Sequence, residues 1–288
     1  MVAANFHREP DASWDFAGPA TTLGASMIGY GSTSGSGLDL RVAGTAAITV
    51  LIEFGDRGLV VDDAAGRRTL GGFVAGLPLA AMRIRAERAE CIEVRMSPLR
   101  AYSLLGIAPT DLGWSAVSLE ELWGRRAQRL REQLASTTDW GERFALTESL
   151  LAQCDRSARG PDPEVTEAWH RILAARGQVR IGGLAESVGW SHKRLWGRFE
   201  SQIGLTPKRV AMLVRFRSAI DGLLAGRAAG EVAADCGYAD QAHLCRDVSI
   251  FADRTPSSLT TQYLPTIARH RYRAWGKNFQ YGGAPVGR

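Results

Sequence analysis

The second half of the chain contains the same short layout twice. The first copy reads GWSHKRLWGRFESQIGLTP from Gly189 to Pro207, and the second reads GYADQAHLCRDVSIFADRTP from Gly237 to Pro256. Each copy opens on glycine and an aromatic residue, continues with apolar residues at helical spacing and closes on Thr-Pro. A glycine-containing turn before an amphipathic helix is typical of a helix-turn-helix. The repeat therefore predicts two such units, 48 to 49 residues apart.

Each predicted unit has an N-cap and an apolar stripe on its second helix. Ser191 precedes the first of these helices and Asp240 precedes the second, and both residue types are strong N-caps. Spacings of i, i+4 and i+7 place side chains on one face of a helix, so this row is predicted to be core. The rows are Leu195, Phe199 and Gln202 or Ile203 in the first helix, and Leu244, Val248 and Phe251 in the second.

The opposite face of each second helix consists mostly of polar or small residues. Arg, Lys, Gln and His can hydrogen-bond to base edges in the major groove of DNA, which admits one α-helix. A solvated surface would explain one such face, but two matched copies favour contact with DNA. These faces carry His192, Lys193, Trp196, Gly197 and Arg198 on the first helix, and Gln241, Ala242, Cys245, Arg246 and Ser249 on the second.

A long helix is predicted between the two units. Thr206 is its expected N-cap, Pro207 occupies its first position, and the helical pattern continues to about Ala225. At about 1.5 Å per residue this helix is roughly 28 Å long, which is close to the ~34 Å repeat of B-DNA. The spacing predicts that the two second helices enter successive major-groove segments on one face of double-stranded DNA.

Charge is distributed unevenly between the two halves. Residues 1–160 contain 17 Lys and Arg against 19 Asp and Glu, whereas residues 161–288 contain 18 against 11. The net charge is therefore −2 in the first half and +7 in the second. A basic domain joined to a mildly acidic one indicates that the basic domain contacts a polyanion, although the same charge could also serve solubility alone.

Composition and motifs exclude several other classes of protein. The chain is 45% apolar and 23% charged, has no signal-peptide pattern, and has no apolar run long enough to span a membrane. Its four cysteines form no CxxC pair, which favours a reduced, cytoplasmic protein. His7 is the only histidine before residue 160, so a histidine-based metal enzyme is not expected. We find no nucleophile elbow, P-loop or dinucleotide fingerprint and expect neither an enzyme nor a cofactor.

The first half is predicted to be β-rich and then helical, which makes the chain α+β overall. We divide it into a sensor or dimerisation domain at 1–154, a linker at 155–163, a DNA-binding domain at 164–262 and a basic tail at 263–288. The tail is either disordered or an arm that contacts phosphates. Predicted strands are Thr45–Phe54, Gly58–Val61, Met82–Ala86 and Glu90–Met96, and predicted helices are Leu99–Leu105, Leu119–Leu134 and Trp140–Gln153.

Residues 164–262 resemble the DNA-binding domain of the AraC/XylS family. The likeness is carried by LAESVGWSHKRLWGRF, GLTPKRVAMLVRFRSAI and EVAADCGYADQAHLCRDVSIFADRTPSSL. It implies a sequence-specific transcription regulator that binds double-stranded DNA and, as an activator, contacts RNA polymerase. The base-contacting positions of the family fall on His192, Lys193, Trp196 and Gly197, and on Gln241, Ala242, Cys245 and Arg246. Trp196 and Gly197 depart from the polar or basic residues that the family usually has there.

The first half is similar to β-rich, cupin-like sensor domains of such regulators, through FVAGLPL, AECIEVRMSPLRAYSLLGIAPTDL and SLEELWG. This resemblance implies control by a small-molecule effector or by homodimerisation. The stripe within Leu119–Leu134 is interpreted either as a dimer face or as packing on the protein's own sheet. It consists of Leu119, Leu122, Trp123, Arg126 or Ala127, Leu130 and Leu134.

Two other classes of protein compete with this interpretation. A DNA-repair alkyl acceptor would need a zinc-activated cysteine cluster, whereas Cys91 and Cys154 each stand alone in the sequence. An interaction module that has lost DNA binding and titrates a partner is the second alternative, and the unusual Trp196 and Gly197 favour it.

Overall fold

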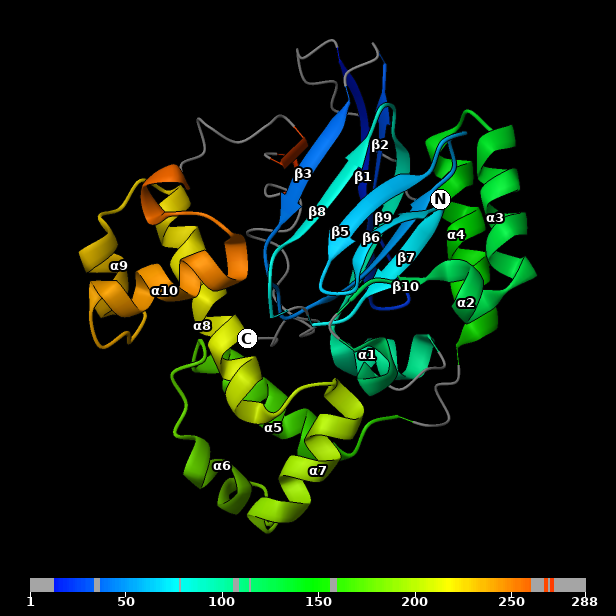
Figure 1. Ribbon diagram of the computed structural model, residues 1–288. Coiled ribbons are helices and arrows are strands. Elements are labelled where there is room, and N and C mark those ends of the chain that lie inside the picture. The colour runs from blue at the N-terminus through cyan, green and yellow to red at the C-terminus, as the bar shows by residue number, and fades with distance from the viewer. Residues whose placement is uncertain are drawn as a thin grey trace, which may run out of the picture.

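The computed structural model describes residues 13–33, 37–77, 79–105, 109–113, 115–155, 160–259, 267–268 and 270–271. Within these ranges the first half of the chain is β-rich with flanking helices, and the second half is helical (Figure 1). The α+β fold predicted from the sequence is confirmed. None of the described helices is both long and apolar enough to cross a membrane.

The β-rich half contains two antiparallel sheets. The larger sheet has the order β1-β2-β9-β4-β7-β10, and the smaller has the order β3-β8-β5-β6. The strands are β1 (Trp14–Thr22), β2 (Ala25–Ser32), β3 (Leu38–Val42), β4 (Ile48–Glu53), β5 (Leu59–Asp63), β6 (Gly66–Leu70), β7 (Gly72–Ala75), β8 (Met82–Ala86), β9 (Glu90–Met96) and β10 (Val117–Ser118).

Five short helical elements follow or interrupt these strands. They are α1 (Pro98–Leu104), the 3₁₀ turn η1 (Pro109–Leu112), α2 (Leu119–Trp123), α3 (Arg125–Ser136) and α4 (Trp140–Cys154). Helices α3 and α4 lie along the larger sheet on the side away from the smaller one (Figure 1). Two of these helices begin at a side-chain cap, since Ser97 accepts a hydrogen bond from Arg100 N at the start of α1 and Asp139 accepts one from Glu142 N at the start of α4.

Strand β4 shows how the two cores form. All six of its residues are buried, because the smaller sheet covers one face of the larger sheet and helices cover the other. Ile48, Val50 and Ile52 belong to the core shared with the helices, whereas Leu51 belongs to the core between the sheets. Because successive side chains of a strand point to opposite faces of the sheet, β4 contributes side chains to both cores.

The sequence predicted the central strands better than the outer ones. Met82–Ala86 and Glu90–Met96 are confirmed with the predicted bounds, and Thr45–Phe54 and Gly58–Val61 correspond to β4 and β5 with shifted ends. Six strands were not predicted, because they are rich in Gly, Ser, Thr or charged residues and are recognised only through their partners. These are β1, β2, β3, β6, β7 and β10.

The prediction of one continuous helix over Leu119–Leu134 is wrong. Gly124, with φ 53° and ψ −131°, separates α2 from α3, and this conformation is readily accessible only to glycine. Ser118 caps α2, and its side chain accepts a hydrogen bond from Glu120 N.

The apolar stripe of this region packs inside the molecule, so it does not form the dimer face that was one of its two interpretations. Four of its members are buried in the core beneath the helices, namely Leu119, Ala127, Leu130 and Leu134.

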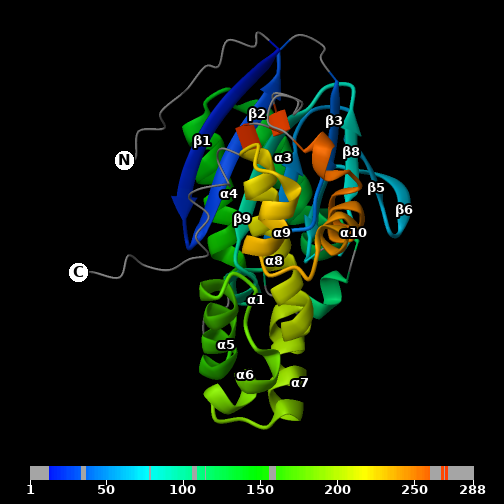
Figure 2. The ribbon, with the colours of Figure 1, turned by 90° about the vertical axis from the view of Figure 1, so that its left-hand side faces the viewer.

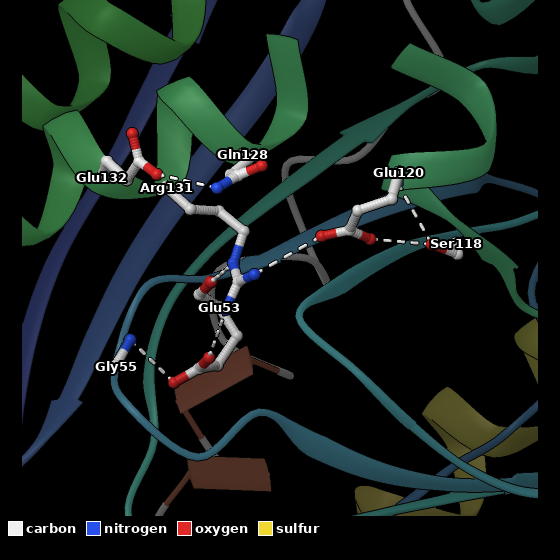
Figure 3. Close-up of polar contacts among 7 residues, drawn as sticks. All are labelled: Glu53, Gly55, Ser118, Glu120, Gln128, Arg131 and Glu132. Atoms are coloured by element: carbon white, nitrogen blue, oxygen red, sulfur yellow. Dashed lines mark hydrogen bonds and ion pairs between the residues drawn. The ribbon is translucent and has the colours of Figure 1, made fainter. Parts of the chain in front are cut away.

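Arg131 anchors α3 to the end of β4 (Figure 3). Its Nε donates to the backbone oxygen of Glu53 at 2.6 Å, and its terminal nitrogens lie 3.5 Å from the Glu53 carboxylate and 3.4 Å from that of Glu120 on α2. Gly55 N also donates to the Glu53 carboxylate at 2.7 Å. Burial raises the pKa of Glu53, against the lowering effect of Gly55 and Arg131. One guanidinium therefore joins two helices and a strand.

The helical half consists of two groups joined by one long helix. In Figures 1 and 2, α8 runs from the lower group of α5, α6 and α7 to α9 and α10, which lie beside the sheets. The bounds are α5 (Pro163–Ala174), α6 (Ile181–Ser187), α7 (His192–Ile203), α8 (Pro207–Leu224), α9 (Ala229–Asp235), α10 (Gln241–Ala252) and the 3₁₀ turn η3 (Pro256–Ser258).

Both groups contact the β-rich half. The C-cap of α7 lies against η1, where a side chain on Gly204 would come within 3.0 Å of the Pro109 oxygen. The end of α10 meets the segment after β3, where Gly44 N donates to the backbone oxygen of Phe251 at 2.8 Å. Arg41 of β3 pairs with Asp253 at the same place.

The described part of the tail differs from the disordered end or DNA arm expected from the sequence. Residues 267, 268, 270 and 271 are helical and pack against the β-rich half, where Ile267 and Arg271 are buried. The rest of the predicted tail lies outside the described residues.

Gly29 of β2 gives a test of the packing between sheet and helices. A methyl group at Gly29 would overlap the Trp140 ring of α4, whereas one at Gly31 would lie 3.9 Å from its nearest neighbours. Gly29→Ala should lower the free energy of unfolding by about 1–3 kcal/mol, the usual cost of overpacking a core. Denaturant unfolding of both variants measures this, and an equal change in Gly31→Ala would contradict the assigned contact.

Candidate nucleic-acid interface

The first helix-turn-helix is built as the sequence predicts. Gly189 has φ +70° in the turn after α6, and Ser191 accepts a hydrogen bond from Arg194 N at the start of α7. Gly204 ends α7 in the left-handed conformation, which glycine adopts at little cost. The buried residues of α7 are Leu195, Phe199, Gln202 and Ile203. One face of the helix is therefore fixed in the core and the other is left to solvent.

The second helix-turn-helix repeats this construction. Gly237 has φ +69° in the turn after α9, and Asp240 accepts a hydrogen bond from His243 N at 2.6 Å. The predicted stripe of Leu244, Val248 and Phe251 is buried. The tandem arrangement predicted from the repeat is confirmed.

The exposed face of α7 contains four of its five predicted DNA contacts. His192, Lys193, Gly197 and Arg198 are exposed. Trp196 is half-buried against the core, and its ring stacks on that of His192 with 3.7 Å between centroids. The two rings form a stacked pair near the N-terminal end of α7.

Gly197 lies on the open side of α7. No atom of the described chain outside its own helix comes within 4 Å of a Cβ placed there. Packing within the protein therefore does not require glycine at this position.

Arg198 is engaged within the protein. Its Nε and Nη2 donate to the two carboxylate oxygens of Asp162 at 2.7 and 2.9 Å. This pairing lowers the pKa of Asp162 and raises that of Arg198, in each case mainly through the hydrogen bond between them. Asp162 is the N-cap residue of α5. Arg198 thus joins α7 to the linker, and a phosphate would have to compete with this carboxylate.

The exposed face of α10 is lined by Gln241, Ala242 and Arg246, while Cys245 is half-buried. The Nε of Arg246 donates to the Ala242 oxygen at 3.3 Å within the same helix. This bond directs the guanidinium along the exposed face and does not use its terminal nitrogens.

Helix α8 holds the two units together. Its 18 residues give a length of about 27 Å. Thr206 occupies the predicted N-cap position, but its side chain makes no capping hydrogen bond. Ten residues of α8 are buried, and Phe216 contacts Phe251 of α10 with 5.0 Å between ring centroids.

The sequence analysis missed a polar cluster that joins α8 to the second unit. Arg215 lies over the Tyr238 ring at 4.5 Å and 3.7 Å from the carboxylate of Asp247. Burial raises the pKa of Tyr238. The available signal was Asp247 itself, which lies three residues after buried Leu244 and therefore on the core side of the helix.

A cleft of about 520 Å³ separates the helical half from the β-rich half. Apolar residues from both sides line it, including Leu40, Phe216 and Ile220. It was not foreseen from the sequence, because its residues come from distant parts of the chain. Six arginines line it: Arg41, Arg83, Arg95, Arg217, Arg254 and Arg271.

The arginines of the cleft outnumber the carboxylates that pair with them. Five of the six have an acidic partner, and Glu93 serves two, so that four carboxylates face six guanidinium groups. These carboxylates are Asp39, Glu93, Asp221 and Asp253. Arg254 has no acidic partner among the described residues. The cleft therefore holds an excess of two positive charges beside apolar surface.

No group of three or more His, Cys, Asp or Glu side chains in the described part of the chain is arranged to hold a metal ion. Cys91, Cys154 and Cys236 are buried, and Cys245 has intermediate exposure. Burial raises the pKa of Cys91, which makes this thiol a poor nucleophile.

Comparison with known proteins identifies the helical half. A family described as "Helix-turn-helix domain" matches residues 184–262. No curated protein matches the chain. A crystal structure of ToxT from Vibrio cholerae O395 is similar with 10% identity and a TM-score of 0.46, over 82% of this chain and 97% of that one.

Two further solved structures are similar at a comparable level. ToxT from V. cholerae strain SCE256, with an unsaturated fatty acid bound, has 9% identity and a TM-score of 0.42 over 88% of this chain and 96% of that one. The AraC-like transcriptional activator CuxR has 18% identity and a TM-score of 0.32 over 67% and 79%. With its two capped helix-turn-helix units joined by α8, the C-terminal half contains an AraC-type helix-turn-helix domain.

Proposed function

We propose that this regulator reads double-stranded DNA with α7 and α10 in two successive segments of the major groove. The observation that carries the proposal is the pair of matched helices joined through α8, each with a buried stripe and an exposed face. The helix that joins them is about 27 Å long, which is close to the ~34 Å repeat of B-DNA. The excess of positive charge in residues 161–288 supports contact with phosphates.

The two helices differ in what they offer to a base pair. Arg246 on α10 is exposed, and its intrahelical hydrogen bond uses Nε and leaves the terminal nitrogens available to donate. Guanine is the base that arginine contacts most often. On α7, Lys193 is a point charge beside the His192–Trp196 stack, and Arg198 pairs with Asp162. We therefore assign most of the sequence specificity to α10, and assign phosphate contact and stacking to α7.

We further propose that the arginine cleft binds a small-molecule effector with an anionic group and an apolar body. Two unbalanced positive charges favour the anion, and the apolar lining favours a hydrocarbon or aromatic portion. Arg95 of β9 and Arg217 of α8 supply like charges from the two sides of the cleft. Burial lowers the pKa of Arg95 to about 10 against the attraction of Glu93, and repulsion by Arg271 and Arg217 acts in the same direction as burial. A bound anion would relieve that repulsion.

Substitution of the two basic residues tests the assignment of the recognition helices. Arg246→Ala should weaken binding to the preferred site by about 1–3 kcal/mol and relax specificity at one base pair. Lys193→Ala should weaken binding evenly across sequences and reduce the salt slope by about one. Selection from random DNA at fixed salt measures both. If the unmodified chain selects no DNA sequence, the result would favour a protein-interaction module instead.

The Gly197→Ala substitution should change the stability of the protein and its affinity for DNA in opposite directions. Because Gly197→Ala removes a glycine from a helix interior and meets no neighbour, it should raise the free energy of unfolding by up to about 1 kcal/mol. The added methyl group should also weaken DNA binding if a base or the backbone approaches this point. Gly183→Ala on α6, which is equally unobstructed, is the control that should leave DNA affinity unchanged. DNA affinity retained in Gly197→Ala would remove this residue from the interface.

Binding of an apolar carboxylate tests the effector site. Octanoate should bind saturably in calorimetry, and Arg254→Gln should weaken its binding about threefold to fivefold, because a solvent-accessible ion pair contributes up to about 1 kcal/mol. Arg67→Gln is the matched control, since Arg67 is exposed on β6 and does not line the cleft. The absence of saturable binding by the unmodified chain, or an equal loss in both variants, would reject the proposed effector chemistry.

A further inference from the structure

The chain's own C-terminal segment, which we define as residues 267, 268, 270 and 271, contributes to the core between the two sheets. Ile267 is buried in the core between the sheets, and the His270 ring stacks on that of Phe16 with 4.0 Å between centroids. The cavity that remains between the sheets is about 20 Å³, which has room for about one water molecule. In this form of the protein, a segment that follows the DNA-binding domain occupies the interior of the N-terminal domain.

A buried ion pair holds this segment in place. The guanidinium of Arg271 donates to both carboxylate oxygens of Glu93, at 2.5 and 2.8 Å, and Glu93 is fully buried. Glu93 lies in the middle of the larger sheet, opposite Ile28 on β2 and Leu51 on β4. A carboxylate among apolar neighbours remains charged only when it is paired.

The Glu93 carboxylate is kept ionised by two arginines. Burial acts to raise the pKa of Glu93, but Arg271 and Arg95 together lower it to about 2. Glu93 in turn holds the pKa of Arg271 above its usual value against the effect of burial. Arg271 therefore completes a charged group that the apolar core would otherwise disfavour.

The direct contact between α10 and β3 has few polar interactions. Gly44 N donates to the backbone oxygen of Phe251, and the Arg41–Asp253 pair is largely exposed. Exposed ion pairs contribute little to stability. The buried pair of Arg271 with Glu93 is better placed to determine whether the second helix-turn-helix stays docked against the sheet.

We propose that the C-terminal segment is a latch: the N-terminal domain binds it through Glu93 and thereby keeps the DNA-binding domain docked against β3. The linker fixes the other end of that domain, where Arg198 pairs with Asp162 and Arg100 pairs with Asp155. With the latch seated, both ends of the DNA-binding domain are held by the sensor half, and the relative positions of α7 and α10 are constrained through it.

The latch is also coupled to the cleft, a step that rests on the proposed effector site. Arg271 and Arg95 belong both to the Glu93 cluster and to the cleft lining. When the C-terminal segment dissociates from the N-terminal domain, the cleft loses Arg271. Because the DNA-binding domain then also undocks, the cleft loses the α8 residues on its opposite side. An anion therefore binds the latched state more tightly and shifts the equilibrium toward it.

Hydrogen exchange of the full-length chain tests the latch. Arg271→Gln should accelerate exchange of the amides at 267–271 about tenfold or more. It should likewise accelerate exchange of the Gly44 amide, whose acceptor lies across the domain boundary. The amides of β9 should be unaffected. Arg41→Gln, which removes only the exposed pair at the same boundary, should leave the amides at 267–271 unchanged.

Two results would overturn the latch. One is faster exchange at 267–271 with no change at Gly44, which would make the segment a local plug that does not hold the domains together. The other is unchanged exchange at 267–271.

If β9 also exchanges faster in Arg271→Gln, the Ile267→Ala variant tests the latch instead. This substitution weakens the packing of the C-terminal segment between the sheets without removing a partner of Glu93. Parallel acceleration at 267–271 and Gly44 in Ile267→Ala would support the latch, and unchanged exchange at Gly44 would reject it.

Octanoate distinguishes the latch from the effector proposal. In the unmodified chain it should slow exchange at 267–271 and at Gly44, and in Arg254→Gln the same protection should require about threefold to fivefold more octanoate. A latch response to Arg271→Gln without any effect of octanoate would reject the effector site and leave the latch standing. Binding of octanoate in calorimetry without protection at these amides would contradict the coupling between them.

Discussion

Helix α8 is the constraint on which the proposed reading of DNA depends. Its buried face is shared by both helix-turn-helix units, so the cores of the two units are continuous through one rigid element. The contact of Phe216 with Phe251 and the cluster of Arg215 with Tyr238 and Asp247 bind the second unit to the middle of α8. Because the helix fixes the spacing, the chain needs no second copy of itself to present two recognition helices.

The two halves of the molecule use charge in different ways. In the DNA-binding half, basic groups such as Lys193 and Arg246 lie on exposed helix faces, where they can meet phosphates and bases. In the β-rich half, several arginines form ion pairs within the protein. Arg131 joins α2 and α3 to β4, and Arg95 pairs with buried Glu93. The cleft lies between the two halves, and both halves contribute arginines to its lining.

Local pattern predicted the helical half well and the β-rich half only in part. The caps at Ser191 and Asp240 and the buried stripes depend on residues within one or two turns, so sequence periodicity suffices. Outer strands such as β1 and β3 depend on partners far along the chain, and the break at Gly124 depends on a single backbone conformation. The pairing of Arg271 with Glu93 joins residues 178 positions apart, and no local pattern indicates it.

The proposed function requires that one chain reads two adjacent major-groove segments. It is tested most directly by guanine-N7 methylation interference on the DNA site that the full-length chain selects. We expect two clusters of interfering guanines on the same face of the duplex, with centres about one helical turn (~10 base pairs) apart. A single cluster, or two clusters on opposite faces, would contradict the arrangement of α7 and α10 along α8.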